Sequence, residues 1–176
     1  VIEMERMCGN IRALRPMVGN KSSGLPVSEW SLEDNIRLSR LIELGSPQNP
    51  FHEPSVQLRN RLLIVLMRLT GKRRGEVLNL QVGDINFRTC QINIVRRPDA
   101  KEDSRPDPPR VKTRAHTIPV SSGLIDLLRD YLQVRRSIPG ATKHPYLLVT
   151  HKACPTQGQP MTKGALNAVF REIRDA

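Results

Sequence analysis

Aromatic residues are scarce in this sequence of 176 residues, where tryptophan, tyrosine and phenylalanine together make up 3%. Proteins that bind single-stranded nucleic acid without sequence preference stack the bases on aromatic side chains. The shortage of aromatic residues therefore argues against a single-strand binder of this type. The sequence also has no apolar run long enough to cross a bilayer and no signal peptide, so we expect no membrane partner.

Cysteine is rare as well, with only Cys8, Cys90 and Cys154. An odd number without a Cys-x-x-Cys pair argues against a disulfide framework and favours a reducing compartment such as the cytoplasm. His144, His151 and Cys154 could be drawn together as metal ligands, but their spacing matches no zinc pattern and a fourth ligand is missing. We therefore predict neither a metal nor another cofactor.

Positive charge is what the sequence has in excess, because 28 lysines and arginines against 17 acidic residues give a formal net charge of +11. A polyanion is the natural partner for such a chain, since neutralising phosphates releases counterions and drives nucleic-acid binding. Ribosomal proteins and membrane-surface proteins are also basic, so charge alone does not choose among these classes.

The hydrophobic pattern predicts a mainly helical chain. Apolar residues recur at helical spacing over residues 4–14, and Pro16 ends this pattern. The following stretch, residues 17–30, is rich in glycine, serine and proline and is typical of a linker. Five helices are predicted after it: from Ser31 to Gly45, along the apolar stripe of 58–69, over 75–81, from Ser121 or Ser122, and from Thr162 onward. Gly71 suits the left-handed residue that commonly follows a helix.

In the middle of the chain the hydrophobic period changes from 3.6 to 2. Residues 84–89 and 90–96 are predicted to be neighbouring strands, and residues 115–120 a third strand, which Pro119 places at a sheet edge. The polar stretch 97–114 is too rich in proline and aspartate for regular structure. The predicted fold class is therefore α+β, mainly helical with a small three-stranded antiparallel sheet.

Two short motifs stand in order around these strands. Residues 70–85 contain Thr-Gly-x-Arg-x-x-Glu, then a leucine and an Asp-Ile pair, and residues 112–119 contain Lys-Thr followed by Ile-Pro. Together they resemble the front part of the catalytic domain of the tyrosine recombinases, the phage integrase family. The resemblance runs from about residue 31 to the end and implies the recombinase fold.

The resemblance also implies a reaction, in which a tyrosine attacks a DNA phosphodiester and leaves a 3′-phosphotyrosyl link and a free 5′-hydroxyl. Arg73 would bind two non-bridging oxygens with its planar fork, Lys112 would protonate the leaving hydroxyl, and Glu76 would help to hold the site. Arg74 competes with Arg73 for the phosphate, and Lys101 with Lys112. Glu76 is also a favourable charge in a first helical turn. No metal is implied, because these cations stabilise the developing charge.

Duplex DNA is the partner that the resemblance implies, held between the catalytic domain and a preceding helical domain. Residues 1–30 would then be the tail of that helical DNA-binding domain plus its linker, and 31–176 the N-terminal part of the catalytic domain. Contacts to the DNA backbone are expected from Lys72, Arg74, Arg96, Arg97, Arg105, Arg110 and Arg114. The interleaved acidic residues Asp99, Glu102, Asp103 and Asp107 resemble a metal site on paper, but among so many cations we expect them to be solvated.

The family's second motif, His-x-x-Arg followed by a further His or Trp and the nucleophilic Tyr, is missing. None of the four histidines has an arginine three residues later, and Tyr131 and Tyr146 lie in apolar segments typical of a core. The chain also begins at Val1 rather than methionine, so we expect a fragment whose second motif lies beyond Ala176 and which is inactive alone.

The parent protein would recombine DNA of a mobile element, as an integrase or a transposase, in the cytoplasm with the nucleoid. It would self-associate as a tetramer on paired sites. Two alternatives remain at this point: a non-catalytic DNA-binding protein on the same fold, or a basic RNA-binding module.

Overall fold

The computed structural model describes residues 31–97, 103–109 and 114–176, and Leu32–Ala176 form one compact unit. In chain order the elements are α2 (Leu32–Leu41), α3 (Pro54–Thr70), α4 (Arg74–Leu78), η1 (Val82–Asp84), β1 (Ile85–Asn86), β2 (Gln91–Ile94), β3 (His116–Pro119), α5 (Ser122–Ser137), η2 (Ala141–Lys143) and α6 (Lys163–Asp175). The predicted α+β class with three short strands is confirmed. The predicted pattern over residues 4–14 lies outside the described residues.

The long helix α3 begins and ends where its sequence dictates. Pro54 occupies the first turn, where its missing N–H costs no hydrogen bond. Gly71 follows the helix in the left-handed conformation, with φ of 61°, and its N–H donates to the carbonyl of Met67 at 3.0 Å. Leu62 and Leu66 of the predicted stripe are buried in the core. The helix therefore delivers a sharp, rigid corner immediately before α4.

The sheet is antiparallel in the order β1-β2-β3, and its inner face is made by isoleucines. Ile85 is opposite Ile92, and Ile92 is opposite Ile118, so one row of β-branched side chains crosses all three strands. Among the residues that the structure describes, β3 pairs with β2 alone, which confirms the predicted edge position of Pro119. The first strand is shorter than predicted, because residues 87–90 form the turn into β2, with Cys90 at a positive φ of 51°.

Hydroxyl caps start the two last helices as predicted. Ser121 accepts from the N–H of Leu124 at 3.3 Å at the start of α5, and Thr162 accepts from Ala165 at 3.1 Å at the start of α6. The sequence of α6 has apolar residues at helical spacing, which predicts a buried stripe of Leu166, Val169, Phe170 and Ile173. This prediction is wrong for Phe170, which is 40% exposed. Leu166, the first residue of that stripe, is buried.

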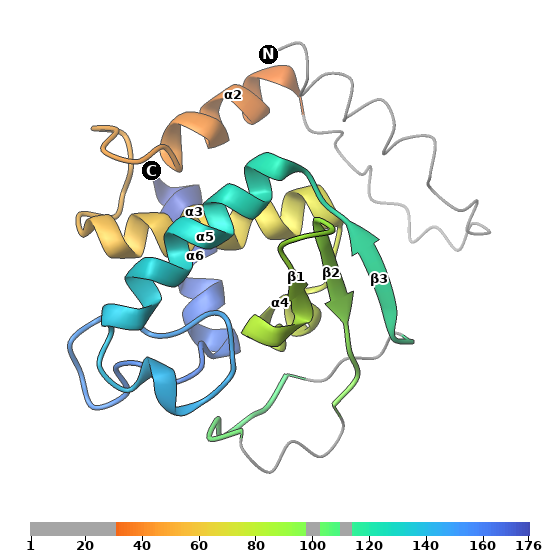
Figure 1. Cartoon of the computed structure of the whole chain (residues 1–176). Helices are drawn as coiled ribbons and strands as arrows, with labels where there is room; N and C mark the ends of the chain where they lie inside the picture. Colours follow the sequence, from red (N-terminus) through yellow and green to blue (C-terminus); the bar gives the residue numbers. More distant parts are fainter. Residues whose placement is uncertain (1–30, 98–102, 110–113) are drawn as a thin grey trace, which may run out of the picture. The chain divides into compact units, whose positions relative to one another are not determined.

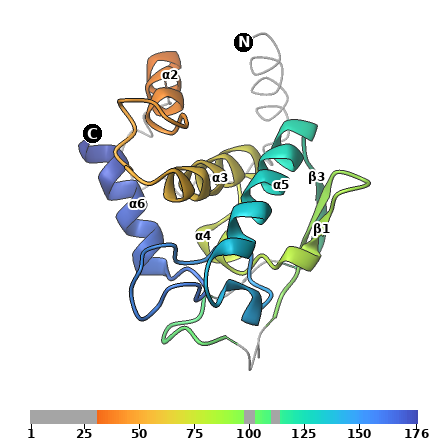
Figure 2. The same ribbon diagram turned by 60° about the vertical axis from the view of Figure 1, so that its left-hand side comes forward.

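The core lies where α3 and α5 pack against each other. Leu62, Leu63 and Leu128 have no exposed surface there. Figure 1 shows the sheet beside this helix pair, with β3 as the outer strand, and Figure 2 shows α6 and the sheet on opposite sides of α3. The short helix α4 lies below α3 in both views. In the part of the chain that the structure describes, no helix is long and apolar enough to span a membrane.

A buried chain of hydrogen bonds connects the start of α3 with α5. Val149 donates its N–H to the Tyr131 hydroxyl at 3.3 Å. The same hydroxyl lies 3.4 Å from Nε2 of His151. Nδ1 of His151 lies 3.1 Å from the Ser55 hydroxyl, which donates to Glu53 at 2.7 Å. Because Ser55 gives its one proton to Glu53, it accepts from Nδ1–H, and Nε2 then accepts from Tyr131. This arrangement fits a neutral ring, which the lowered pKa of His151 favours.

Acid should destabilise the fold through this histidine. Burial, with the nearby charge of Arg59, lowers the pKa of His151 from 6.5 to about 4. The folded state therefore binds fewer protons than the unfolded state, so stability present above pH 6.5 is lost as the pH falls towards 4. The difference between these pKa values corresponds to about 3 kcal/mol of unfolding free energy.

We expect His151→Gln to flatten this acid limb, measured by urea unfolding across the pH range. Burial also lowers the pKa of His144, which should retain a smaller part of the effect. The control His52→Gln changes an exposed histidine and should leave the pH dependence of the unfolding free energy intact. An unchanged acid limb in the His151 variant contradicts this account.

Candidate functional site

The corner between α3 and α4 holds the backbone of Arg73 from both sides. Its N–H donates to the Glu76 carboxylate at 2.8 Å, and its carbonyl accepts from the N–H groups of Glu76 and Val77 at 2.9 and 3.1 Å. Glu76 is buried, whereas the side chain of Arg73 is exposed. The sequence therefore places a guanidinium on a backbone position that has little freedom to move.

The two cations beside Arg73 reach in different directions. Lys72 Nζ lies 2.8 Å from Nε2 of His116, the first residue of β3. Arg74 donates to the side-chain oxygen of Asn167 in α6 at 2.9 Å. The corner is therefore tied to β3 on one side and to α6 on the other, with Arg73 between the two ties.

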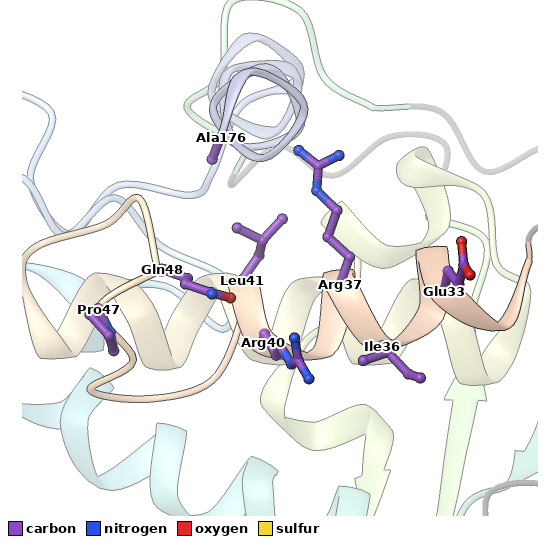
Figure 3. A pocket seen from close by; sticks show the side chains of 8 residues that line it. All are labelled: Glu33, Ile36, Arg37, Arg40, Leu41, Pro47, Gln48 and Ala176. Atoms are coloured by element: carbon purple, nitrogen blue, oxygen red, sulfur yellow. The ribbon is translucent and has the colours of Figure 1, made fainter.

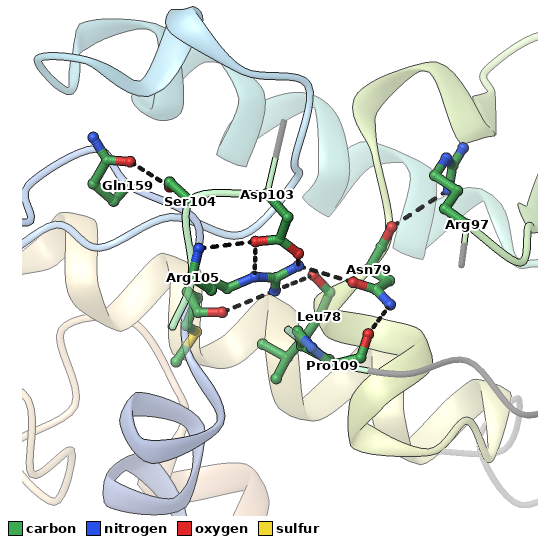
Figure 4. Close-up of polar contacts among 9 residues, drawn as sticks. Leu78, Asn79, Arg97, Asp103, Ser104, Arg105, Pro109 and Gln159 are labelled. Atoms are coloured by element: carbon green, nitrogen blue, oxygen red, sulfur yellow. Dashed lines mark hydrogen bonds and ion pairs between the residues drawn. The ribbon is translucent and has the colours of Figure 1, made fainter. Parts of the chain in front are cut away.

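The other end of α4 is held by the side chain of Arg105, which comes from the long connection between β2 and β3. Its five N–H groups all have acceptors: both carboxylate oxygens of Asp103 at 2.7 and 2.6 Å, the carbonyls of Leu78 and Met161 at 3.0 and 3.2 Å, and Asn79 Oδ1 at 2.8 Å. Figure 4 shows these contacts converging on one guanidinium.

An aromatic ring completes the environment of this guanidinium, which stacks over Tyr146 with 4.6 Å between its carbon and the ring centroid. Burial alone would raise the pKa of Asp103, but hydrogen bonds from Arg105 and its charge lower that pKa overall. Asn79 in turn donates to the carbonyl of Pro109. Residues 103–109 are thus fixed to the C-terminal end of α4.

A second ion pair fixes the start of the same connection. Arg97 contacts both carboxylate oxygens of Asp84, one of them at 3.1 Å. The side chain of Asp84 is 6% exposed and that of Arg97 is 23% exposed. Asp84 also accepts from the N–H of Gln81 at 2.8 Å, which anchors η1. The motif aspartate therefore holds the connection between β2 and β3 as well as the turn that leads into β1.

These contacts correct part of the predicted DNA surface. Arg105 was expected to meet the DNA backbone, but its side chain is 1% exposed and every donor is bound inside the protein, so it is a structural residue. The charge of Arg97 is largely matched by Asp84. Arg96 and Arg114 are exposed, as a backbone contact requires. Lys101, Arg110 and Lys112 lie outside the described residues.

The other candidate groups lie apart from one another. His144 Nε2 contacts the carbonyl of Gly158 at 2.6 Å, His151 belongs to the buried chain of hydrogen bonds, and Cys154 lies 3.2 Å from the Thr156 hydroxyl. Across the described ranges, no three His, Cys, Asp or Glu side chains form a group that could hold a metal ion. Asp103 and Asp107, two of the four acidic residues considered as a metal site, instead pair with Arg105 and Lys163.

An open groove of about 700 Å³ lies between α2 and the end of α6. Its lining consists of Glu33, Ile36, Arg37, Arg40, Leu41, Pro47, Gln48 and Ala176. Arg37 and Leu41 point towards the end of α6, whereas Ile36 and Arg40 point to the other side of α2 (Figure 3). None of these residues belongs to the corner or to the connection between β2 and β3, so the groove is separate from the candidate site.

Sequence reasoning missed three residues that position the site. Asn79, His116 and Asn167 fix α4 or the corner through partners 26, 44 and 93 residues away. Such distances in the sequence leave no local pattern to read. The Asp103–Arg105 pair, two residues apart, is a contact that proximity could have indicated.

We expect Arg105→Ala to lower the free energy of unfolding by about 3–5 kcal/mol, because it leaves the buried carboxylate of Asp103 without its partner. Arg96→Ala removes an equal charge from an exposed position and should change stability by less than about 0.5 kcal/mol. Urea unfolding measures both. The double variant Arg105→Met, Asp103→Leu should recover part of the loss. A single variant as stable as the control would show that the pair does not hold the connection.

The comparisons with known proteins agree with the motif at the corner. A model of the phage integrase family matches residues 47–176, which include α3, the corner, the sheet and α6. A search among curated proteins found no match.

Proposed function

This chain belongs to the phage integrase family, the tyrosine recombinases, and we propose that it supplies the duplex-DNA binding surface and part of the active site of a site-specific recombinase. The observation that carries the proposal is the fixed corner. Glu76 holds the Arg73 backbone at 2.8 Å, while the cations on either side are tied to β3 and α6. An exposed guanidinium on such a rigid support is suited to binding a phosphate.

The chemistry needs this arrangement because a phosphodiester gains negative charge on its non-bridging oxygens during attack. Arg73 would bind two of these oxygens with its planar fork and would stay charged throughout the reaction. Glu76 accepts a backbone hydrogen bond, so its role in the proposal is to position Arg73 rather than to touch the substrate. Preorganisation of this kind removes the cost of ordering the donors during the reaction.

Lys112 is proposed as the general acid that protonates the leaving 5′-hydroxyl. It precedes His116 by four residues in the sequence, and a chain of that length spans at most about 14 Å. His116 itself contacts Lys72 in the corner. Chain connectivity therefore supports a lysine within reach of the phosphate that Arg73 binds.

The nucleophile is proposed to come from a segment outside residues 1–176. The sequence has two tyrosines, Tyr131 and Tyr146, and they are 0% and 1% exposed. Burial raises the pKa of Tyr131 to about 12. Neither hydroxyl can attack a DNA phosphate without unfolding the core, so we expect this chain alone to bind DNA without cleaving it.

In the whole protein we propose cleavage and rejoining through a 3′-phosphotyrosyl link, by a tetramer on paired sites of a mobile element. Residues 1–30 are proposed to be the tail of a preceding helical DNA-binding domain plus its linker, and 31–176 the N-terminal part of the catalytic domain. Lys72, Arg74, Arg96, Arg110 and Arg114 remain as proposed contacts to the DNA backbone, mostly without reading bases.

The chain should bind a duplex of about 30 base pairs more tightly than structured RNA, with affinity falling about a thousandfold between 50 and 200 mM salt. Several phosphate contacts by exposed cations account for that dependence. Fluorescence anisotropy across a salt series measures both affinities. A preference for RNA at every salt concentration would favour a basic RNA-binding module instead.

Arg73→Ala should abolish cleavage in the recombinase that joins this domain to its nucleophilic tyrosine, while duplex affinity remains largely intact. Loss of a transition-state donor of this kind costs at least about a hundredfold in rate. Arg136→Ala is the matched control and should retain cleavage, because it removes an exposed arginine of α5 that belongs neither to the corner nor to the proposed DNA contacts. Covalent protein–DNA complex, measured on denaturing gels, is the readout. Wild-type amounts of it in the Arg73 variant would count against the assignment.

A further inference from the structure

The contact between Lys72 and His116 has a defined proton arrangement. Lys72 Nζ lies 2.8 Å from Nε2 of His116, and Nδ1 of the same ring lies 2.9 Å from the carbonyl oxygen of Arg114. A carbonyl only accepts, so Nδ1 carries the proton, and an ammonium only donates, so Nε2 accepts from Lys72. One neutral tautomer satisfies both contacts.

This neutral acceptor has an electrostatic consequence for the corner. A carboxylate in the place of the imidazole would hold Lys72 equally well but would cancel its positive charge. The imidazole fixes the ammonium and leaves the charge in place, one residue from Arg73. In the connection between β2 and β3, by contrast, the cations are neutralised by carboxylates. Arg105 pairs with Asp103, and Arg97 pairs with Asp84.

The contact also joins two parts of the fold that lie 44 residues apart in the sequence. His116 is opposite Ile94 at the start of β3, and Lys72 follows the left-handed Gly71. Both side chains are half-buried. The strand itself is held by four residue pairs with β2, so the sheet does not depend on this contact. The contact instead links the corner directly to the first residue of β3.

We propose that His116 is a positioning residue of the phosphate site: it holds Lys72, and through it the corner that carries Arg73, without reducing the positive charge that attracts the phosphate. This inference rests on the proposed function. It assigns to His116 no contact with the substrate. The proposed role requires one hydrogen-bond acceptor on the side chain at position 116. A glutamine can supply this acceptor, and a phenylalanine cannot.

The first experiment tests the contact in the DNA-free chain by nuclear magnetic resonance of the ring nitrogens of His116. We expect a protonated Nδ1 and a hydrogen-bonded, unprotonated Nε2, whose resonance moves in Lys72→Met. Lys143→Met is the control, since it removes an exposed lysine from η2. An Nε2 resonance that is the same in both variants overturns the inference, whatever the chain binds.

The second experiment tests the consequence on a DNA duplex. In the wild type and in His116→Gln, adding duplex should shift the side-chain Nε–H resonance of Arg73. In His116→Phe this shift should be lost, while the thermal unfolding midpoint and the slope of affinity against salt concentration stay as in the wild type. Thr117→Ala, the next residue of β3 on the opposite face, is the matched control and should keep the shift.

The outcomes separate this inference from the function on which it rests. If the wild type binds duplex and the Arg73 resonance shifts equally in His116→Phe, the positioning role is overturned and the proposed function stands. If the wild type does not bind duplex at all, the proposed function fails and this inference fails with it. Loss of the shift in His116→Phe with its retention in His116→Gln supports both.

Discussion

The attachment of the short helix α4 at both of its ends is the constraint on which the rest of this structure depends. At its start, the Glu76 carboxylate accepts the backbone N–H of Arg73, and Lys72 reaches β3. At its end, the carbonyl of Leu78 accepts from the buried guanidinium of Arg105. A helix of five residues has too few internal hydrogen bonds to hold its own orientation, so these tertiary contacts determine where Arg73 is aimed.

The basic residues of the chain divide into two groups that differ in burial and in what their charge contributes. Arg105 is desolvated and has an acceptor for every N–H, and a buried cation is tolerable only under such conditions. Arg73, Arg96 and Arg114 keep exposed side chains and therefore contribute to the long-range field that attracts a polyanion. The net charge of +11 thus overstates the binding surface, because part of it organises the interior.

The sequence predicted those features that depend on neighbours along the chain. The left-handed Gly71, the caps at Ser121 and Thr162 and the edge proline all follow from local backbone chemistry and were found where expected. Contacts between distant residues were not predictable, because a lone arginine in a polar stretch has the same local pattern whether it points inward or outward. Arg105 was misassigned for this reason.

Phe170 illustrates the same limit for apolar residues, since helical spacing identifies a stripe but does not show how much of it a neighbouring element covers. The central claim is that the corner aims Arg73 at a DNA phosphate while Arg105 serves the fold. A crystal structure of this chain bound to duplex DNA tests it most directly. The account predicts that the Arg73 guanidinium binds two non-bridging oxygens of one phosphate while Arg105 stays on Asp103. It is contradicted if Arg73 lies away from the DNA.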